Sequence, residues 1–211
     1  MRFSTEKREQ GFTLIELLIA MALALIVITS LSSAFISQRK IYAAQEQVSE
    51  MIQNARAAMD MISREVKMAG YDPTGSGSFS LPYNSDTSTV DIYADIDGDG
   101  SITTSTGSKD HITYSKATGE EIIRRNTNTG GGAQQLAENI KSLSFTYWYQ
   151  DPTAGLTEVT SVADQDKITS IKVTIEARTA EEDPNYTHPT YGNGYRTYTL
   201  SSYVTPPNLG L

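Results

Sequence analysis

The sequence predicts an α+β protein in which one long N-terminal helix packs on an antiparallel β-sheet. Three features of the chain support this prediction. Residues 17–37 are uncharged and largely apolar, an amphipathic pattern continues to residue 69, and short segments of alternating apolar and polar residues follow from residue 89. A helix with one apolar stripe and a sheet with one apolar face can bury each other. The segments are justified below in chain order.

Composition excludes several classes of protein. The chain has 211 residues, no cysteine and a formal net charge of −8. Without cysteine there is no disulfide framework, thiolate metal site or thiol nucleophile. The acidic balance does not favour nucleic acid as a partner, because neutralising phosphates needs a basic surface. The mean hydropathy of −0.34 resembles that of a soluble domain and hides where the apolar residues lie.

The apolar stretch 17–37 predicts a single membrane span. Its 21 residues carry no charge, and a helix of that length rises roughly 30 Å, the thickness of the hydrocarbon core of a bilayer. Residues 1–11 are polar and resemble the cytoplasmic flank of a signal sequence. A cleavable secretory signal peptide has an apolar stretch of only about 7–15 residues, so this segment is predicted to remain an anchor.

The helix is predicted to continue beyond the membrane as an amphipathic stem. No Gly or Pro occurs between Phe12 and Ala69, Gly70 is a plausible C-terminal cap, and Pro73 prevents continuation. Apolar residues recur every three or four positions and predict the buried face: Ile41, Ala44, Val48, Ile52, Ala55, Met59, Ile62, Val66 and Ala69. The predicted solvent face carries Arg56, Asp60, Arg64 and Lys67. A coiled coil is the alternative interpretation of this pattern.

The segment 71–89 is rich in Gly, Ser, Thr, Pro and Asn, which predicts a long surface loop. Period-two alternation then predicts six strands that form one sheet, covered by the stem: 89–96, 111–115, 121–125, 141–149, 169–178 and 195–204. In the first of these, Val90, Ile92, Ala94 and Ile96 are expected to point to the buried face.

The junction before the apolar stretch carries the most specific motif, GFTLIELL at residues 11–18. A carboxylate in a membrane helix costs about 2.5–3.5 kcal/mol on insertion scales, so Glu16 is expected to be functional. The motif resembles the type III signal of type IV prepilins and type II secretion pseudopilins. An ordinary signal anchor with a chance Gly-Phe pair would leave Glu16 unexplained.

This resemblance implies a pilin-like fold and a maturation pathway. Prepilin peptidase would cut after Gly11, and Phe12 would become the N-methylated mature N-terminus. Glu16 would pair with the amine of a neighbouring subunit during assembly. The implied organisation is a cleaved leader (1–11), a transmembrane and assembly helix (12–38), an amphipathic stem (39–70) and a periplasmic β-rich head (71–211). Other minor and major pilins and an inner-membrane assembly platform are the implied partners.

Looser motifs in the head resemble the PilW-type minor pilins, relatives of the J pseudopilin of type II secretion. They are AGYDP, DIDGDG, ITY, LAENIKSLSFTY and ITSIKVTIEART. The resemblance implies a subunit that helps to initiate pilus assembly and to form the tip complex, with effects on adhesion and twitching motility. It also implies an inner-membrane protein with a periplasmic head that is later located in the pilus at the cell surface. A J-type pseudopilin and a membrane-anchored binding domain with a pilin-like leader remain alternatives.

The segment DIDGDGS predicts a candidate Ca²⁺ site. Its spacing directs Asp95, Asp97, Asp99 and Ser101 toward one point, as in Ca²⁺-binding loops. However, Thr106 occupies the position of the usual bidentate Glu, for which Asp110, Glu120 or Asp91 would have to substitute. An Asp- and Gly-rich turn that binds no metal is the alternative. No cofactor is otherwise predicted.

No catalytic residues are predicted. His111 and His188 are the only histidines, and their spacing matches no zinc motif. The chain lacks a nucleophile elbow and a phosphate-binding loop. A set of aromatic residues is expected mainly to fill the core, with a minority exposed for contacts: Tyr147, Trp148, Tyr149, Tyr186, Tyr191, Tyr195, Tyr198 and Tyr203. The polar loop 181–194 is a candidate contact segment.

Overall fold

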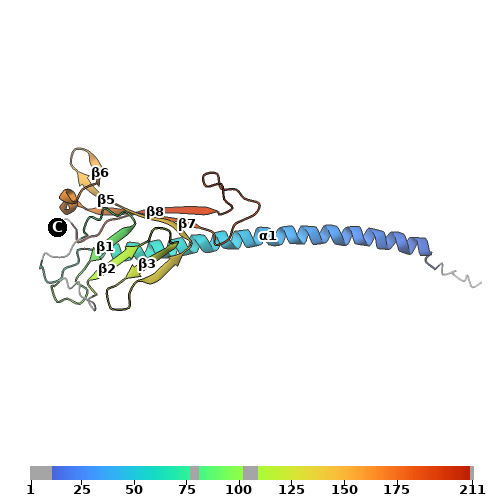
Figure 1. Cartoon of the computed structure of the whole chain (residues 1–211), viewed down its shortest axis with the longest axis horizontal. Helices are drawn as coiled ribbons and strands as arrows, with labels where there is room; N and C mark the ends of the chain where they lie inside the picture. Colours follow the sequence, from blue (N-terminus) through green and yellow to red (C-terminus); the bar gives the residue numbers. More distant parts are fainter. Residues whose placement is uncertain (1–10, 77–80, 102–108, 210–211) are drawn as a thin grey trace, which may run out of the picture. The chain divides into compact units, whose positions relative to one another are not determined.

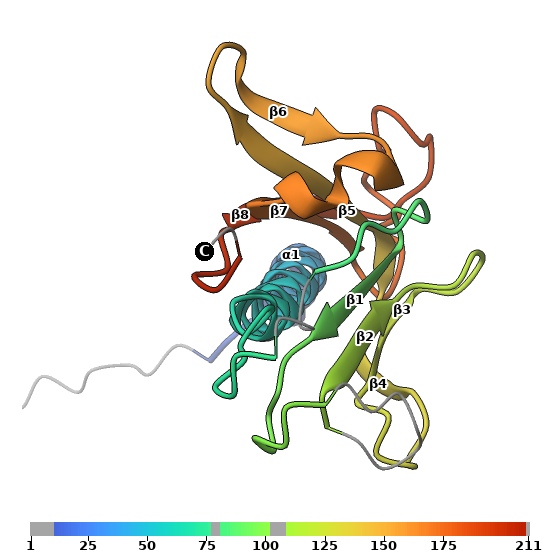
Figure 2. The same cartoon turned by 90° about the vertical axis from the view of Figure 1, so that its left-hand side faces the viewer.

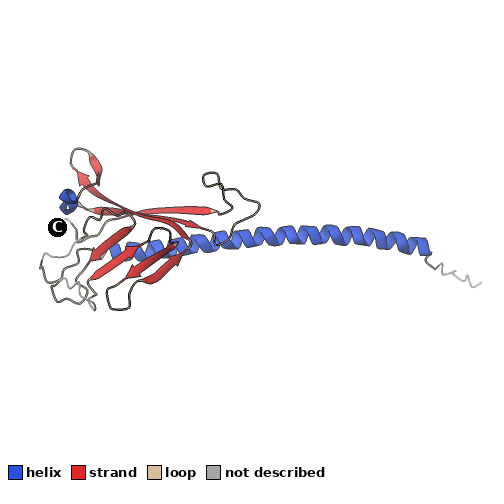
Figure 3. Ribbon diagram, in the orientation of Figure 1, coloured by secondary structure: helices blue, strands red, loops and turns tan. Residues whose placement is uncertain are grey.

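The computed structural model describes residues 11–76, 81–101 and 109–209. It contains a helix α1 followed by eight strands and one short 3₁₀ helix (Figure 1). Their bounds are α1 Leu14–Val66, β1 Thr89–Tyr93, β2 His111–Ser115, β3 Ile122–Asn126, β4 Gln134–Glu138, β5 Ile140–Asp151, β6 Gly155–Val159, η1 Val162–Lys167, β7 Ser170–Arg178 and β8 Thr197–Val204. The predicted α+β class is confirmed: a long N-terminal helix precedes antiparallel strands (Figure 3).

The chain divides into two compact units, residues 1–46 and 47–211. In the first unit, α1 is continuous from Leu14, and its large apolar side chains are exposed. The second unit contains the rest of α1 and all the strands. Its hydrophobic core is one cluster whose buried members all lie between Met51 and Val204. The head unit therefore has a complete core of its own.

Eight strands form two four-stranded antiparallel sheets, with the orders β1-β2-β3-β4 and β6-β5-β7-β8. Viewed along α1, the two sheets lie on different sides of the helix segment that belongs to the head (Figure 2). A backbone hydrogen bond from Phe145 N on β5 to the carbonyl of Thr87, two residues before β1, links the second sheet to the entry of the first at 2.7 Å. The expected single sheet is therefore wrong, because one sheet covers only part of a helix surface and the second sheet buries more of it.

The amphipathic face of the head segment of α1 is largely as predicted. Its buried residues are Met51, Ala55, Ala58, Met59, Ile62 and Val66, and Ala69 just beyond the helix is also buried. The four charged residues predicted on the solvent face, Arg56, Asp60, Arg64 and Lys67, are all exposed. Met51 and Ala58 widen the apolar stripe, because α1 contacts sheets on two sides rather than one.

The central strands β5 and β7 match the alternating pattern. On β5, Leu143, Phe145 and Tyr147 are buried, and β7 buries Ile171, Val173, Ile175 and Ala177. Strand β1 is shorter than predicted and ends at Tyr93, and Ile96 is 39% exposed rather than buried. The chain leaves the sheet there because Asp95 begins a turn through Gly98 and Gly100, both with positive φ.

Two edge strands were not predicted from the sequence. Strand β4 pairs with β3, and β6 forms a hairpin with β5. Their burial patterns show only one fully buried position each, Ala137 and Val159. An edge strand with one buried residue does not show the alternation that identifies a half-buried strand.

Candidate functional site

The N-terminal end of α1 is built as a capping box. Thr13 precedes the first helical residue, Leu14, and its backbone N and Oγ1 donate to Oε2 of Glu16 at 3.1 and 3.0 Å. The backbone N of Glu16 donates in return to Oγ1 of Thr13 at 3.3 Å. These bonds satisfy backbone donors that the first helical turn leaves without partners. They also place the carboxylate at the positive end of the helix dipole.

Thr13 was missed by the sequence interpretation, although the Thr-x-x-Glu spacing is a recognisable capping signal. In this arrangement Glu16 lies four residues after Phe12, which precedes the helix and is 91% exposed. The carboxylate predicted to pair with a neighbouring amine is thus oriented by its own chain. The predicted roles of Gly11, Phe12 and Glu16 remain predictions.

The first half of α1 has the character of an anchor. Among the described residues, α1 is the one helix with a stretch long and apolar enough to cross a membrane, and none of that stretch is buried. Two of its hydroxyl side chains bond within the helix: Thr29 Oγ1 donates to the carbonyl of Ile26 at 3.2 Å, and Ser30 Oγ donates to the same carbonyl at 2.9 Å. Such bonds satisfy hydroxyl groups where water is absent. Together with the resemblance of residues 11–18 to prepilin signals, this helix indicates membrane anchoring.

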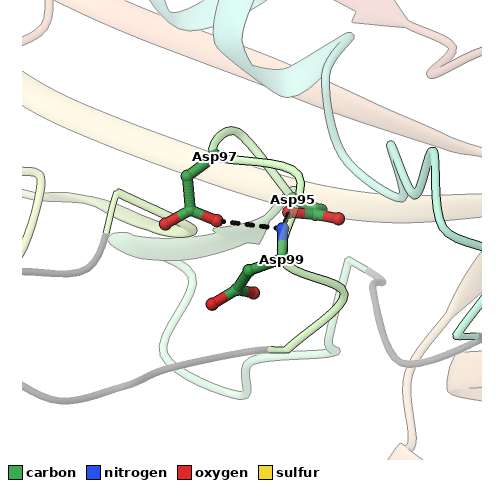
Figure 4. Close-up of side chains that lie close together, drawn as sticks. All are labelled: Asp95, Asp97 and Asp99. Carbon is green, nitrogen blue, oxygen red and sulfur yellow. Dashed lines mark hydrogen bonds between the residues drawn. The ribbon is translucent and has the colours of Figure 1, made fainter.

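In the head, the three Asp residues of the candidate Ca²⁺ site lie close together (Figure 4). One carboxylate oxygen from each of Asp95, Asp97 and Asp99 lies within 4.8 Å of the others. Asp97 and Asp99 are exposed, whereas Asp95 is fully buried. Three hard, negatively charged donors at this spacing fit the coordination preference of Ca²⁺.

The same loop is also stabilised without a metal. The carboxylate of Asp95 accepts bonds from the backbone N of Gly98 at 2.7 Å, Asp99 at 3.1 Å and Gly100 at 3.1 Å. Oδ1 of Asp99 accepts a bond from the backbone N of Ser101 at 2.7 Å. The arrangement therefore agrees with both interpretations of the sequence, the Ca²⁺ loop and the Asp-rich turn.

The substitute ligands named from the sequence lie in different environments. Asp110 is buried beside the loop and accepts a bond from Ile96 N at 3.2 Å. Asp91 instead bonds His111 at 2.9 Å, and Glu120 pairs with Arg124 at 3.0 Å. Thr106 lies outside the described residues. Of the three candidates, Asp110 is therefore the one whose carboxylate contacts the loop.

The two histidines belong to separate structural networks. The ring of His111 stacks on Tyr93, with centroids 4.5 Å apart, and bonds Asp91. The pKa of the Asp91 carboxyl is lowered mainly by this hydrogen bond, against the opposing effect of burial, with further help from Thr113. His188 orders a loop far from His111 in the sequence, through bonds from the backbone N of Thr190 and Tyr191 to its Nδ1 at 3.1 and 3.3 Å.

Comparison with known proteins supports the interpretation of the N-terminal segment. Residues 7–32 match the family model of the prokaryotic N-terminal methylation motif. The match spans Gly11, Phe12 and Glu16, and it confirms the resemblance of this segment to prepilin-type proteins. Such proteins are structural subunits rather than enzymes, as the sequence predicted.

Among solved structures, the chain is similar to a type IV-like pilin from Thermus thermophilus. The identity is 11%, the alignment covers 75% of this chain and 98% of that chain, and the TM-score is 0.44. No curated protein sequence matches the chain significantly.

Proposed function

We propose that this prepilin-type protein is a minor pilin of a type IV pilus that helps to initiate filament assembly and to form the tip complex. The observation that carries the proposal is the N-terminal methylation motif, which matches residues 7–32 and contains the Gly11-Phe12 junction and Glu16. The resemblance of the head motifs to PilW-type minor pilins supports the finer assignment. Adhesion and twitching motility are the activities that such a subunit would affect.

The proposed assembly step follows from electrostatics. Cleavage after Gly11 would create a new, N-methylated amine at Phe12, four residues before Glu16. Inside a membrane or an apolar filament core, an isolated carboxylate is costly and gains most by pairing with an opposite charge. The amine of a neighbouring subunit provides that charge. The capping box of Thr13 and Glu16 supports this step, since it orders the carboxylate before a neighbour arrives.

Location and partners follow from the same proposal. The precursor would cross the inner membrane once through the first half of α1, with the head in the periplasm. Prepilin peptidase would act on its cytoplasmic side. An assembly platform and other minor and major pilins would then incorporate the mature chain through its apolar helix, whose large side chains are exposed from Leu14 to Ile36.

A J-type pseudopilin of type II secretion is the nearest alternative, because it would use the same leader, anchor and assembly carboxylate. A membrane-anchored binding domain that uses the leader only for delivery is a second alternative. The pseudopilin alternative differs from the proposed minor pilin in serving a secretion system rather than a pilus. The anchored-domain alternative differs from it in keeping the leader uncleaved.

The test is a deletion strain complemented with wild-type protein, Glu16→Ala or the control Glu46→Ala. Glu46 is an exposed carboxylate on the same helix, beyond the apolar stretch. The deletion should reduce surface pili and twitching by at least about tenfold and leave secretion unchanged. Glu16→Ala should be processed and reach the membrane but be lost from sheared filaments, whereas Glu46→Ala should behave as wild type.

Normal filament incorporation of Glu16→Ala would contradict the assembly step. A secretion defect with normal pili would favour the pseudopilin alternative, and an intact leader in cells would favour the anchored domain. These outcomes are separable, because processing, piliation and secretion are measured independently.

A Ca²⁺-binding function at residues 95–101 is proposed as a second property of the head. The convergence of three carboxylates within 4.8 Å supports it. The buried carboxylate of Asp110 accepts a hydrogen bond from Ile96 N and so helps to order the loop. The ion would neutralise the mutual repulsion of Asp95, Asp97 and Asp99.

A further inference from the structure

Strand β8, Thr197–Val204, forms one edge of the sheet β6-β5-β7-β8 (Figure 2). It is eight residues long, and its register with β7 is continuous from Thr197 to Val204. Its sequence, TYTLSSYV, contains no charged residue and no proline. Edge strands are usually protected from pairing with another chain by short length, bulges, charges or proline. Strand β8 has none of these protections.

The other three edge strands that the structure describes are β1, β4 and β6, and each is five residues long. Each of them carries a carboxylate: Asp91 on β1, Glu138 on β4 and Glu158 on β6. Short length and charge therefore protect these three edges, and both are missing from β8. This contrast indicates that β8 is a surface for strand pairing.

A backbone bond next to β8 shows which of its groups face outward. Thr179 N donates to the carbonyl of Arg196 at 2.9 Å, in register with the β7–β8 ladder, so Arg196 directs its backbone toward β7. In an antiparallel ladder, consecutive residues direct their N–H and C=O groups alternately toward the partner strand and away from it. Thr199, Ser201 and Tyr203 therefore direct these groups to the open edge.

This open edge matches an extended backbone. Its outward N–H and C=O groups recur at every second residue, about 7 Å apart along the strand. No hydrogen bond from elsewhere in the described chain reaches the backbone of Thr199, Ser201 or Tyr203, and all three residues are exposed. A helix satisfies its backbone groups internally, whereas a strand directs them outward with the same spacing as this edge.

The side chains along the edge define the chemistry of an added strand. On the face toward the core, Tyr198 and Leu200 are partly buried and pack against the hydrophobic cluster. On the opposite face, Thr199 and Ser201 are exposed, and Oγ of Ser201 lies 3.0 Å from Oγ1 of Thr174. Side chains directly opposite each other on neighbouring strands are about 4.5–5.5 Å apart. An added strand therefore fits best with apolar residues on its core-facing side and small polar residues on the other.

A second copy of β8 is a less suitable occupant, because β8 runs in the same direction as the head segment of α1. It starts opposite the end of β7, near which Glu181 N bonds Oε1 of Gln47 at 3.4 Å, and it leads to Leu209, which lies beside Gly70. An antiparallel pair of β8 strands would direct two head segments of α1 oppositely, although the N-terminal part of α1 anchors each chain. A parallel pair avoids this conflict but is less stable per residue.

We propose that the open edge of β8 binds an extended segment of a different protein as an added antiparallel strand. The segment alternates apolar and small polar residues, and it is uncharged where it faces β8, because β8 provides no charge to pair with it. Backbone hydrogen bonds provide affinity, and the alternating side chains provide specificity. This surface belongs to the head and does not depend on the proposed role in a pilus.

The experiment measures binding of a fluorescein-labelled peptide of alternating Thr and Val to the full chain in detergent micelles, by fluorescence anisotropy. N-methylation of every Val leaves the Thr N–H groups free on one edge and prevents the peptide from aggregating. The same peptide N-methylated at every residue has no N–H group to donate and is the backbone control. Saturable binding of the first peptide should be at least about tenfold tighter than that of the second.

Ser201→Pro tests the edge itself. It removes an outward N–H group but no bond to β7, and proline is tolerated on an edge strand whose N–H faces solvent. It should weaken binding of the first peptide at least about tenfold. Ser201→Ala is the matched control, because it loses the same hydroxyl and retains the N–H group, so its affinity should equal that of the wild type. Circular dichroism shows whether both variants are folded.

Amide hydrogen exchange at residue resolution is a second measurement that needs no variant. The first peptide should slow exchange at Thr199 and Ser201 at least about tenfold. Exchange at Tyr198 and Leu200 should remain unchanged, because their N–H groups already face β7.

Equal binding of the two peptides, no binding of either, or unchanged exchange at Thr199 and Ser201 would overturn the proposal. Full binding by a folded Ser201→Pro variant would overturn it as well. Dimers of the full chain that Ser201→Pro abolishes and the first peptide dissociates would assign the edge to a second copy, against the proposed partner.

Discussion

The guanidinium group of Arg125 on β3 binds the carboxylate of Glu65 near the end of α1. Nη2 lies 2.5 Å from Oε1, and Nε lies 2.9 Å from Oε2. The hydroxyl of Tyr114 on β2 donates to the same carboxylate. Burial and this carboxylate raise the pKa of Tyr114 far above its usual value, so the hydroxyl remains a donor. This network joins the helix to the sheet β1–β4.

Arg125→Leu should destabilise the head, because it leaves Glu65 as a largely buried charge without its partner. Breaking a fully buried ion pair lowers the free energy of unfolding by about 3–5 kcal/mol. Because the side chains of Arg125 and Glu65 remain 25% and 13% exposed, a smaller loss of about 2–3 kcal/mol is expected. Urea unfolding of residues 47–211, which contain the complete core, measures it through fluorescence of the single Trp148.

Arg124→Leu is the control for this prediction. Arg124 pairs with Glu120 at the surface, where the two side chains are 36% and 42% exposed, and such pairs are worth less than about 1 kcal/mol. Equal losses in the two variants would show that the Glu65–Arg125 pair is not a main link between helix and sheet.

Acidification should destabilise the head partly through Asp91. Its pKa is held below the ordinary value by the hydrogen bond with His111, so the unfolded chain takes up the proton at a higher pH than the folded chain. The stabilisation is therefore complete above the ordinary pKa of about 4 and is lost as the pH falls through the lower folded value. Asp91→Asn should lose less stability than wild type between about pH 5 and pH 2.5.

Thermal melting across this pH range checks the prediction, with Asp60→Asn as the control. Asp60 pairs with Arg64 at the surface, and both side chains are more than 70% exposed. Its variant should therefore follow the wild-type pH profile. Parallel profiles for wild type and Asp91→Asn would rule out Asp91 as a source of acid sensitivity.

Calcium should raise the melting temperature of the head if the Asp95–Ser101 loop binds it. Ligand at 100 times its dissociation constant stabilises a folded protein by about 2.7 kcal/mol. Asp97→Asn removes one charge but retains the oxygen that accepts the bond from Asp99 N at 3.3 Å, so it should abolish most of the calcium response without unfolding the loop.

Differential scanning calorimetry with calcium, magnesium or chelator measures this response. Asp164→Asn, which removes a carboxylate that is 40% exposed and pairs with Lys167, should respond as the wild type does. An unchanged melting temperature of the wild type in millimolar calcium would favour the metal-free turn.

Gly70 ends the helical region with φ of +75°, a conformation that favours glycine. A Cβ atom there would lie 2.9 Å from Cδ2 of Leu209 and 3.1 Å from the carbonyl oxygen of Asn208. Gly70→Ala should therefore lower the free energy of unfolding by about 2–3 kcal/mol. About 1–2 kcal/mol of this comes from the backbone conformation, and the rest comes from displacing the C-terminal segment.

Gly119→Ala separates these two contributions. Gly119 has φ of +83°, and an added Cβ would meet no atom within 4 Å. Only the conformational cost of about 1–2 kcal/mol should remain, measured by urea unfolding. Equal costs at Gly70 and Gly119 would indicate that the C-terminal segment does not pack against the end of the helix.

The parts of the fold that the sequence predicted share one property: their pattern is local. The stem helix and the strands β5 and β7 bury residues at regular spacing, so periodicity identifies them. The edge strands β4 and β6 were missed because each buries a single residue fully. Strand β1 was predicted too long because Ile96 continues the alternation into a turn that Asp95 stabilises.

The sequence by itself determined the long N-terminal helix, its apolar first half, the prepilin-type junction and the clustering of Asp95, Asp97 and Asp99. Each of these is encoded by neighbours in the chain, through helical spacing or short motifs. Only the tertiary structure decided that two sheets cover the head segment of α1, that Glu65 meets Arg125, and that Lys141 and Asn193 line one cavity. Those pairs are 60 and 52 residues apart, and such contacts depend on which strands pair.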